Sequence, residues 1–245
     1  MMRIYHTSDL HDRRDFVEPL CELRRNAPGW YFDSGDSLRG SQTVFHRDEP
    51  IQRALDRAGC DAQAIGNREF HYLFGAMAAR ARRTHHPLIC SNLVDVRGRT
   101  LPFANHLRFT NEHGSIYLIG LLVMQYPTGS RWERAFGWRF LDPGTVVAQH
   151  AAAVREDEYF IVLSHLGLRR DREIAAKQQR IDLLLGGHSH DTLEQPQVVG
   201  RVPIVHAGPY GRFASVSELR RCDGQAQLER FNLAPLIDDR GPNRR

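Results

Sequence analysis

Lysine is nearly absent from this sequence of 245 residues, although the chain does not lack positive charge. Lys177 is the single lysine among 33 basic residues, and 29 acidic residues leave a formal net charge of +4. The arginines are scattered, and their densest clusters, residues 80–83 and 244–245, are short. A nucleic-acid partner is therefore allowed but not favoured. We interpret the bias toward arginine as genomic base composition, with selection for phosphate contacts as the alternative.

Cysteine and long apolar runs are also scarce. The four cysteines, Cys21, Cys60, Cys90 and Cys222, lie far apart and form no CxxC motif, which excludes a disulfide scaffold and predicts reduced, mostly buried thiols. No basic segment followed by an apolar segment opens the chain, so we expect no signal peptide. Every apolar run is shorter than a membrane span. We therefore expect a cytoplasmic protein with no membrane partner.

Internal repeats, low-complexity segments and linkers rich in proline, glycine or serine are absent as well. A hydrophobic content of 41% and a charged content of 25% are typical of a folded globular protein. We expect a single domain over residues 1–235. Residues 236–245 are mostly polar and contain Gly241-Pro242, which predicts a disordered tail.

Short apolar runs alternate with helix-like segments along most of the chain. Strands are expected at Met2–His6, Trp30–Asp33, Ala62–Ile65, Pro87–Cys90, Ser115–Leu122, Tyr159–Leu163 and Asp182–Leu185. Helices are expected at Asp12–Arg25, Glu49–Ala58, Tyr72–Arg83, Pro143–Arg155 and Asp171–Lys177. After Gln195 only β-hairpin patterns remain, at Gln197–Gly200, Val202–Ala207, Phe213–Arg220 and Gln225–Asn232. This order predicts an α/β domain with a mixed sheet.

Five of the expected strands are followed at once by side chains that bind divalent cations. Ile4-Tyr5 leads to Asp9 and His11, Trp30–Phe32 to Asp36, Ala64-Ile65 to Asn67, Ile161–Leu163 to His165, and Leu183–Leu185 to His188 and His190. In open α/β folds, ligands bind in the crevice beyond the carboxyl ends of the strands. We therefore expect these seven side chains to converge on one site.

The expected ligand set has two carboxylates, one amide oxygen and four imidazoles, which is more than a single ion needs. Two ions that share a bridging carboxylate suit it better. Mixed nitrogen and oxygen ligands favour manganese, with iron, zinc, cobalt or nickel as alternatives. Such a pair of ions attracts phosphate oxygens and generates hydroxide from water near neutral pH. The residue types thus indicate phosphoryl chemistry.

Six stretches of the chain occur in the order of a known family: residues 6–11 (HTSDLH), 34–41 (SGDSLRGS), 65–70 (IGNREF), 163–167 (LSHLG), 186–190 (GGHSH) and 207–211 (AGPYG). On these motifs the chain resembles the calcineurin-like metallophosphoesterases, specifically the bacterial 5′-nucleotidase/UDP-sugar hydrolase branch. The resemblance implies a four-layer α/β/β/α sandwich of two mixed sheets flanked by helices. It also implies two metal sets, one of Asp9, His11, Asp36 and His190, the other of Asp36, Asn67, His165 and His188, with Asp36 shared.

One motif departs from the family pattern. After Gly66-Asn67 the family has His-Glu-Phe-Asp, where the His–Asp pair assists the reaction near the phosphate, whereas this chain has Arg68 and His71 at those two positions. Arginine does not donate a proton at neutral pH, but it can clamp phosphate oxygens. We expect Arg68 to contact phosphate and His71 to be the remaining candidate acid. The alternatives are a solvent-exposed Arg68 and a His71 that only packs on a helix.

Other polar residues near the motifs are expected to be structural. Glu69 is expected to hydrogen-bond either the backbone or an imidazole next to the site, and His6 is expected to be buried on the first strand with a hydrogen bond. The family's 5′-nucleotidases carry a further C-terminal domain that holds the nucleobase, and this sequence ends near the close of the catalytic motifs. Nucleotide specificity therefore does not follow from the resemblance.

These observations predict a metal-dependent phosphoric ester hydrolase that uses hydroxide on two metal ions to attack a small phosphorylated substrate, such as a nucleotide. Asn67 and Arg68, together with the two ions, are expected to hold the anionic phosphate oxygens. One alternative is a phosphodiesterase that acts on cyclic nucleotides or nucleic acid. Another is a metal-dependent module that binds phosphorylated ligands with weak or no turnover, because the His–Asp pair is missing. The sequence does not predict the oligomeric state.

Overall fold

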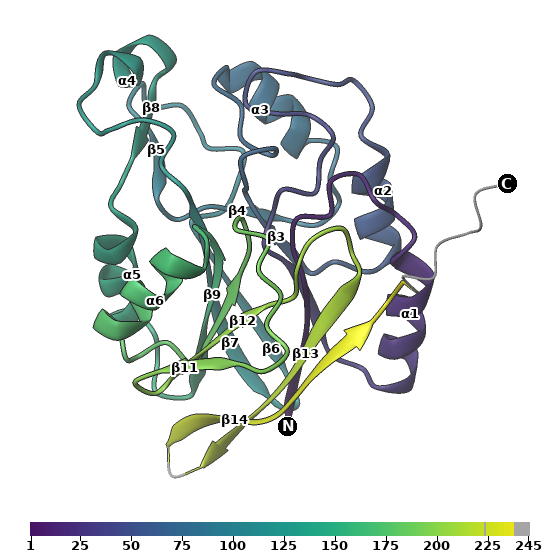
Figure 1. Ribbon diagram of the computed structural model, residues 1–245. Coiled ribbons are helices and arrows are strands. Elements are labelled where there is room, and N and C mark those ends of the chain that lie inside the picture. The colour runs from purple at the N-terminus through teal and green to yellow at the C-terminus, as the bar shows by residue number, and fades with distance from the viewer. Residues whose placement is uncertain (223, 238–245) are drawn as a thin grey trace, which may run out of the picture.

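Two six-stranded sheets pack face to face at the centre of the computed structural model, which describes residues 1–222 and 224–237 (Figure 1). The first sheet contains β1 (Met2–Thr7), β2 (Trp30–Asp33), β3 (Ala62–Ala64), β4 (Leu88–Ile89), β13 (Phe213–Cys222) and β14 (Gln225–Pro235), in the order β14-β13-β1-β2-β3-β4. Strands β1 to β4 are parallel, and β13 and β14 add an antiparallel edge.

The second sheet is also mixed. It contains β6 (His106–Asn111), β7 (Gly114–Leu122), β9 (Glu158–His165), β10 (Leu183–Gly186), β11 (Gln197–Val199) and β12 (Val202–His206), in the order β11-β12-β10-β9-β7-β6. Its four central strands are parallel, and β6 and β11 pair antiparallel at the two edges. A separate pair, β5 (Leu93–Asp95) and β8 (Trp138–Phe140), lies outside both large sheets.

Helices cover the outer faces of both sheets, so the fold has the four layers that the resemblance implied. The helices within the described residues are α1 (Val17–Asn26), α2 (Pro50–Arg57), α3 (Phe74–Ala81), α4 (Arg131–Phe136), α5 (Pro143–Ala151) and α6 (Leu168–Lys177), of which α4 lies by β8 and covers neither large sheet (Figure 1). Helices α1 and α2 lie on one side of the sandwich, and α5 and α6 lie on the other (Figure 1). The predicted fold class is therefore confirmed.

Strand β9 shows why the apolar runs of the sequence are continuous rather than alternating. Ile161 points between the two sheets and packs with the other inner residues, whereas Phe160 and Val162 point outward against α5 and α6. Both faces of the strand are buried, so both need apolar side chains. The same burial fixes the register, because a slip of one residue would exchange the two faces.

The observed elements depart from the expected ones in a few places. The helix expected from Asp12 begins only at Val17, and Asp12 itself has a left-handed φ angle of 63° that a right-handed helix does not contain. The sequence patterns missed four short or edge elements, α4, β5, β6 and β8. The four cysteines form no disulfide, and Cys60 and Cys90 are buried.

The packed chain extends beyond the boundary expected at residue 235. Leu236 is buried in the cluster under α1, and its backbone N–H donates to the carbonyl of Arg212 at 2.8 Å. The rest of the expected tail, residues 238–245, lies outside the described residues. Among the residues that the structure describes, no helix has the length and apolar character needed to cross a membrane.

Candidate metal centre

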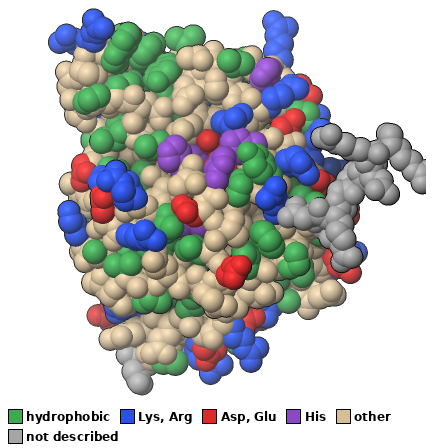
Figure 2. All heavy atoms as spheres, in the orientation of Figure 1, with side chains coloured by type: hydrophobic (Ala, Val, Ile, Leu, Met, Phe, Trp, Pro, Cys, Tyr) green, Lys and Arg blue, Asp and Glu red, His purple; other side chains and the backbone are tan. Residues whose placement is uncertain are grey.

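The seven predicted ligand residues follow the carboxyl ends of parallel strands in the two sheets. Asp9, His11, Asp36 and Asn67 come after β1, β2 and β3, whereas His165, His188 and His190 come at or after the ends of β9 and β10. Packing the sheets face to face brings these ends together. Figure 2 shows histidine side chains gathered on one face of the molecule, with arginines near them.

Asp9, His11 and His190 form the first of two ligand groups. Their potential ligand atoms all lie within 4.8 Å of one another. The Nε2 atoms of His11 and His190 are 3.1 Å apart, and the Nε2 atom of His190 is 3.5 Å from Oδ1 of Asp9. Asp9 is buried and accepts the backbone N–H of His188 on both carboxylate oxygens, at 3.2 and 3.0 Å. A fixed carboxylate therefore faces two imidazoles.

Asp36, His165 and His188 form the second group, and their ligand atoms meet the same 4.8 Å limit. The Nδ1 atom of His165 donates to the carbonyl of Ser34 at 2.8 Å, so the neutral ring, the form that binds a metal ion, has its lone pair on Nε2. That Nε2 atom is buried without a hydrogen-bond partner and lies 3.3 Å from Oδ1 of Asp36. Two electron-pair donors that face each other in a buried site fit a shared cation, and this is the observation that supports a metal ion here.

With no cation between them, the same two side chains attract each other as an ion pair. Burial opposes both charges, yet the attraction between the two groups prevails: it lowers the pKa of Asp36 to about 2 and raises that of His165 to about 9. Burial, with Asp36 and Asp33 nearby, also raises the pKa of Glu69 to about 7. Within the described part of the chain, the ion pairs of Asp9 and Asp36 are with histidines. The site is therefore rich in negative charge that a divalent cation would neutralise.

The backbone at the site is strained. Five of the seven predicted ligands, Asp9, His11, Asp36, His188 and His190, have left-handed φ angles between 49° and 76°. Such angles are uncommon outside glycine and cluster at functional sites. Gly35 and Gly66 allow the ends of β2 and β3 to approach, because a Cβ on Gly66 would lie 2.5 Å from the backbone nitrogen of Asp36. The strained backbone thus fixes the ligand side chains, and the favourable packing of the rest of the fold offsets the conformational energy that this costs.

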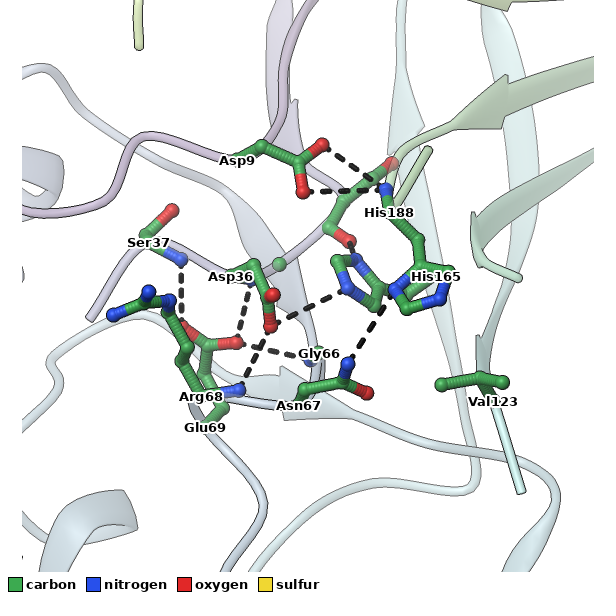
Figure 3. Close-up of polar contacts among 12 residues, drawn as sticks. Asp9, Asp36, Ser37, Gly66, Asn67, Arg68, Glu69, Val123, His165 and His188 are labelled. Carbon is green, nitrogen blue, oxygen red and sulfur yellow. Dashed lines mark hydrogen bonds and ion pairs between the residues drawn. The ribbon is translucent and has the colours of Figure 1, made fainter. Parts of the chain in front are cut away.

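Glu69 fastens the loops that carry Asp36 and Asn67 (Figure 3). Its two carboxylate oxygens accept four backbone N–H groups, from Asp36, Ser37, Leu38 and Gly66, at 2.7 to 3.1 Å. The expectation that Glu69 bonds the backbone is confirmed. The side chain is buried and shapes the site without facing it as a ligand.

Asn67 and Arg68 lie beside the second group, whereas His71 does not. The Nδ2 atom of Asn67 is 3.4 Å from Nδ1 of His188, and the backbone N–H of Arg68 donates to Oδ1 of Asp36 at 2.7 Å (Figure 3). The guanidinium of Arg68 contacts the carbonyls of residues 38–40 at 3.3 to 3.5 Å. His71 is buried, and its Nδ1 atom accepts the backbone N–H of Leu73 at 3.0 Å, where α3 begins.

Two residues at the site were not singled out from the sequence. Tyr210 donates its backbone N–H to the carbonyl of Asp9 at 2.8 Å, and its ring centroid lies 5.4 Å from that of His11 and 5.8 Å from that of His190. Gln125 donates to Asn67 at 3.0 Å. Tyr210 lies in the 207–211 motif, and Gln125 follows β7, so the strand-end rule could have found both.

Comparisons with known proteins agree with this geometry. A family model described as calcineurin-like phosphoesterase matches residues 2–192. The chain is 29% identical to the uncharacterized metallophosphoesterase YunD of Bacillus subtilis, over 89% of this chain and 50% of that protein. It is 25% identical to the 5′-nucleotidase of Mus musculus, over 86% of this chain and 45% of that protein.

Solved structures show the same fold. The 5′-nucleotidase precursor from Thermus thermophilus superposes with a TM-score of 0.80 at 19% identity, over 96% of this chain and 54% of that chain. The chain thus spans about half the length of these relatives. The likeness in fold extends across both sheets.

Proposed function

The chain belongs to the calcineurin-like phosphoesterase family, and from that premise we propose that it hydrolyses small phosphate esters at a centre of two divalent metal ions. The observation that supports this most directly is the pairing of two ligand groups, Asp9/His11/His190 and Asp36/His165/His188, at the mouth of the sandwich. Manganese is the ion we propose, because the groups mix carboxylates with imidazoles. We propose the cytoplasm as the compartment, since the four cysteines are unpaired.

The protein residues divide the work of holding the ions. Asp9, His11 and His190 would hold one ion, His165 and His188 the other, and Asp36 would bridge the two, with Asn67 as a further ligand of the second ion. Burial lowers the pKa of His11 and of His188, so both rings are neutral near pH 7 and present lone pairs. Ions bound there would supply positive charge that orients the phosphoryl group and activates water.

Arg68 is the residue we propose for the phosphate oxygens. Its guanidinium is fixed against three backbone carbonyls and is permanently charged. A fixed cation beside the ligand groups can stabilise the charge that develops on phosphate during an in-line displacement. We do not assign His71 the role of acid, because its ring bonds the backbone at the start of α3.

Nucleotides and related phosphomonoesters are the substrates that the names of the relatives suggest. One observation favours diesters or anhydrides as a second class. Arg68 stands where a proton donor would assist the leaving group, and substrates with good leaving groups need that help least.

The decisive experiment is a metal-by-substrate screen of the purified chain. We expect Mn²⁺-dependent hydrolysis of 4-nitrophenyl phosphate that is lost on chelation and in Asp36→Ala, whose shared carboxylate is removed. Bis(4-nitrophenyl) phosphate in the same screen separates monoesterase from diesterase. Thermal stabilisation by Mn²⁺ and phosphate with no turnover of any substrate would instead indicate a binding module. Equal turnover by Asp36→Ala and wild type would place the activity elsewhere.

A further inference from the structure

A chain of three side-chain amides ends at the second ligand group. Gln125 follows β7 and donates through Nε2 to the carbonyl of Val123 at 2.8 Å and to Oδ1 of Asn67 at 3.0 Å. Its Oε1 atom accepts from Nε2 of Gln42 at 3.1 Å. Asn67 then directs its Nδ2 atom toward Nδ1 of His188, 3.4 Å away (Figure 3).

The carbonyl of Val123 fixes the direction of this chain. A backbone carbonyl only accepts hydrogen bonds, so the atom of Gln125 beside it must be the amide nitrogen. The second N–H of that nitrogen then faces Asn67, and the facing atom of Asn67 must be its oxygen. Gln42 supports the same orientation of the Gln125 amide, because its Nε2 atom donates to Oε1 of Gln125. Each amide is satisfied in this one orientation.

In this orientation Asn67 withholds its amide oxygen from the second ion, so the ligand role proposed above requires the amide to turn. An amide binds a cation through its oxygen, since the nitrogen has no free lone pair. Asn67 turns its nitrogen toward His188 and gives its oxygen to Gln125. A half-turn of the amide would present the oxygen to the ion, but it would also bring Nδ2 of Asn67 against Nε2 of Gln125, and two donors do not bond.

We propose that Gln125 is a positioning residue that sets the orientation of the Asn67 amide and thereby limits the affinity of the second ligand group for its ion. This inference rests on the proposed metal centre. Gln42 lies between β2 and α2, and Gln125 lies between β7 and α4, so the amide chain joins loops of both sheets. Both glutamines are only partly buried, which leaves them open to substitution without disturbing the core.

The test replaces the donor by an acceptor. In Gln125→Glu the carboxylate gives up the bond to the carbonyl of Val123, which also only accepts, and shifts to accept the N–H of Asn67, so the amide oxygen of Asn67 turns toward the ligand group. We expect the dissociation constant of the more weakly bound Mn²⁺ to fall about tenfold, measured by titration calorimetry of metal-free protein and by the electron paramagnetic resonance signal of free Mn²⁺. Gln125→Leu, which removes the donor without adding charge, should lower it about threefold and serves if the first variant does not fold.

A double variant separates orientation from added charge. In the Asn67→Ala background no amide can turn, so Gln125→Glu should give no gain in affinity beyond that of Met124→Glu, which adds the same charge at an exposed neighbour. A gain in the Asn67→Ala background that exceeds the gain from Met124→Glu, or no gain in either Gln125 variant, overturns the proposal. If wild type binds Mn²⁺ and Asp36→Ala does not, such a result leaves the metal centre intact. If wild type binds no ion, both proposals fail.

Discussion

The carboxylate of Glu69 accepts the backbone N–H of Asp36 at 2.7 Å, and so holds the loop from which the Asp36 side chain faces His165. The same carboxylate accepts three more backbone N–H groups. A buried carboxyl group thus holds the loop in place from the side away from the ligand groups. The position of Asp36 therefore depends on a residue that does not itself reach the ligand groups.

Glu69→Gln should destabilise the fold and weaken metal binding together. The amide nitrogen that replaces one oxygen would face backbone N–H donors and leave them unsatisfied in the interior, at a cost of about 2–4 kcal/mol. Urea unfolding measures the stability, and calorimetry measures Mn²⁺ affinity. Glu49→Gln is the matched control, because Glu49 is equally buried and accepts the N–H groups of residues 39 and 40. If both variants lose the same Mn²⁺ affinity, the role assigned to Glu69 is wrong.

Gly186→Ala should break a buried hydrogen bond between α6 and the second sheet. The Nε2 atom of His206 lies 2.8 Å from Oδ2 of Asp171, and a Cβ on Gly186 would lie 2.1 Å and 2.5 Å from these two atoms. All three residues lie in the interior, so the overpacked site should cost about 1–3 kcal/mol of unfolding free energy.

Gly75→Ala is the control for this substitution. Gly75 lies in α3, and an added Cβ there meets no atom within 4 Å, so alanine should stabilise the helix by roughly 0.5–1 kcal/mol. Chemical unfolding of both variants is the measurement. An unchanged midpoint for Gly186→Ala would show that His206 and Asp171 relax without loss.

The α/β class and the location of the candidate site could be predicted from local signals in the sequence, whereas the two-sheet sandwich was implied by the family resemblance. Apolar runs buried on two faces mark parallel strands, and polar residues that follow directly mark their carboxyl ends. Asp36 and His165 come from different sheets, yet each is found by this rule. Their distance of 3.3 Å requires the packing of the two sheets, which no local pattern encodes.

The parts that escaped prediction lack such signals. Strands β5 and β8 are three residues each and pair with one another across a long sequence separation. Asp12 is excluded from a helix by its left-handed φ, which the helical pattern of its neighbours does not reveal. The orientation of Asn67 depends on the carbonyl of Val123, a backbone atom whose position the residue type does not reveal.

The fold should lose stability in acid through His6. This residue is fully buried on β1, where its ring nitrogens lie 2.9 Å from Oγ of Ser34 and 3.2 Å from Oγ of Ser215. Burial, and then His206, lowers the pKa of His6 from 6.5 to about 3. Below pH 6.5 the unfolded chain binds a proton that the folded chain excludes until about pH 3. The free energy of unfolding therefore decreases as the pH is lowered through this window, by at most about 1.4 kcal/mol per pH unit for this residue.

His6→Gln removes the titrating ring and keeps a side-chain amide that can hydrogen-bond Ser34 and Ser215. Urea unfolding at pH 6.5, 5.5 and 4.5 should show a steeper loss of stability for wild type than for the variant. Between pH 5.5 and 4.5 the two slopes should differ by roughly the uptake of one proton, which is about 1.4 kcal/mol per pH unit. His113→Gln, at an exposed position, should keep the wild-type slope. Coincident slopes for wild type and His6→Gln would mean that His6 is protonated in the folded state.

Arg68→His should restore help to poor leaving groups. Arg68 cannot give up a proton near neutral pH. Burial is the larger cause of the lowered pKa of His11 in the first ligand group, and the charge of Arg68 is the second. An imidazole at the same position titrates near neutrality and can protonate the departing oxygen. An alkyl phosphate needs that proton, whereas 4-nitrophenolate leaves without it. The ratio of kcat/KM for an alkyl phosphate to that for 4-nitrophenyl phosphate should therefore rise at least about tenfold.

Arg68→Lys is the matched control, because it keeps a cation without a titratable imidazole. Its two rates should fall together, since loss of the planar guanidinium weakens the hold on phosphate oxygens for both substrates alike. Inhibition by inorganic phosphate should weaken in both variants if Arg68 contacts the phosphoryl group. A ratio that stays the same in Arg68→His would mean that bond cleavage here needs no proton donor at position 68, and that the arginine was exchanged without loss of leaving-group assistance.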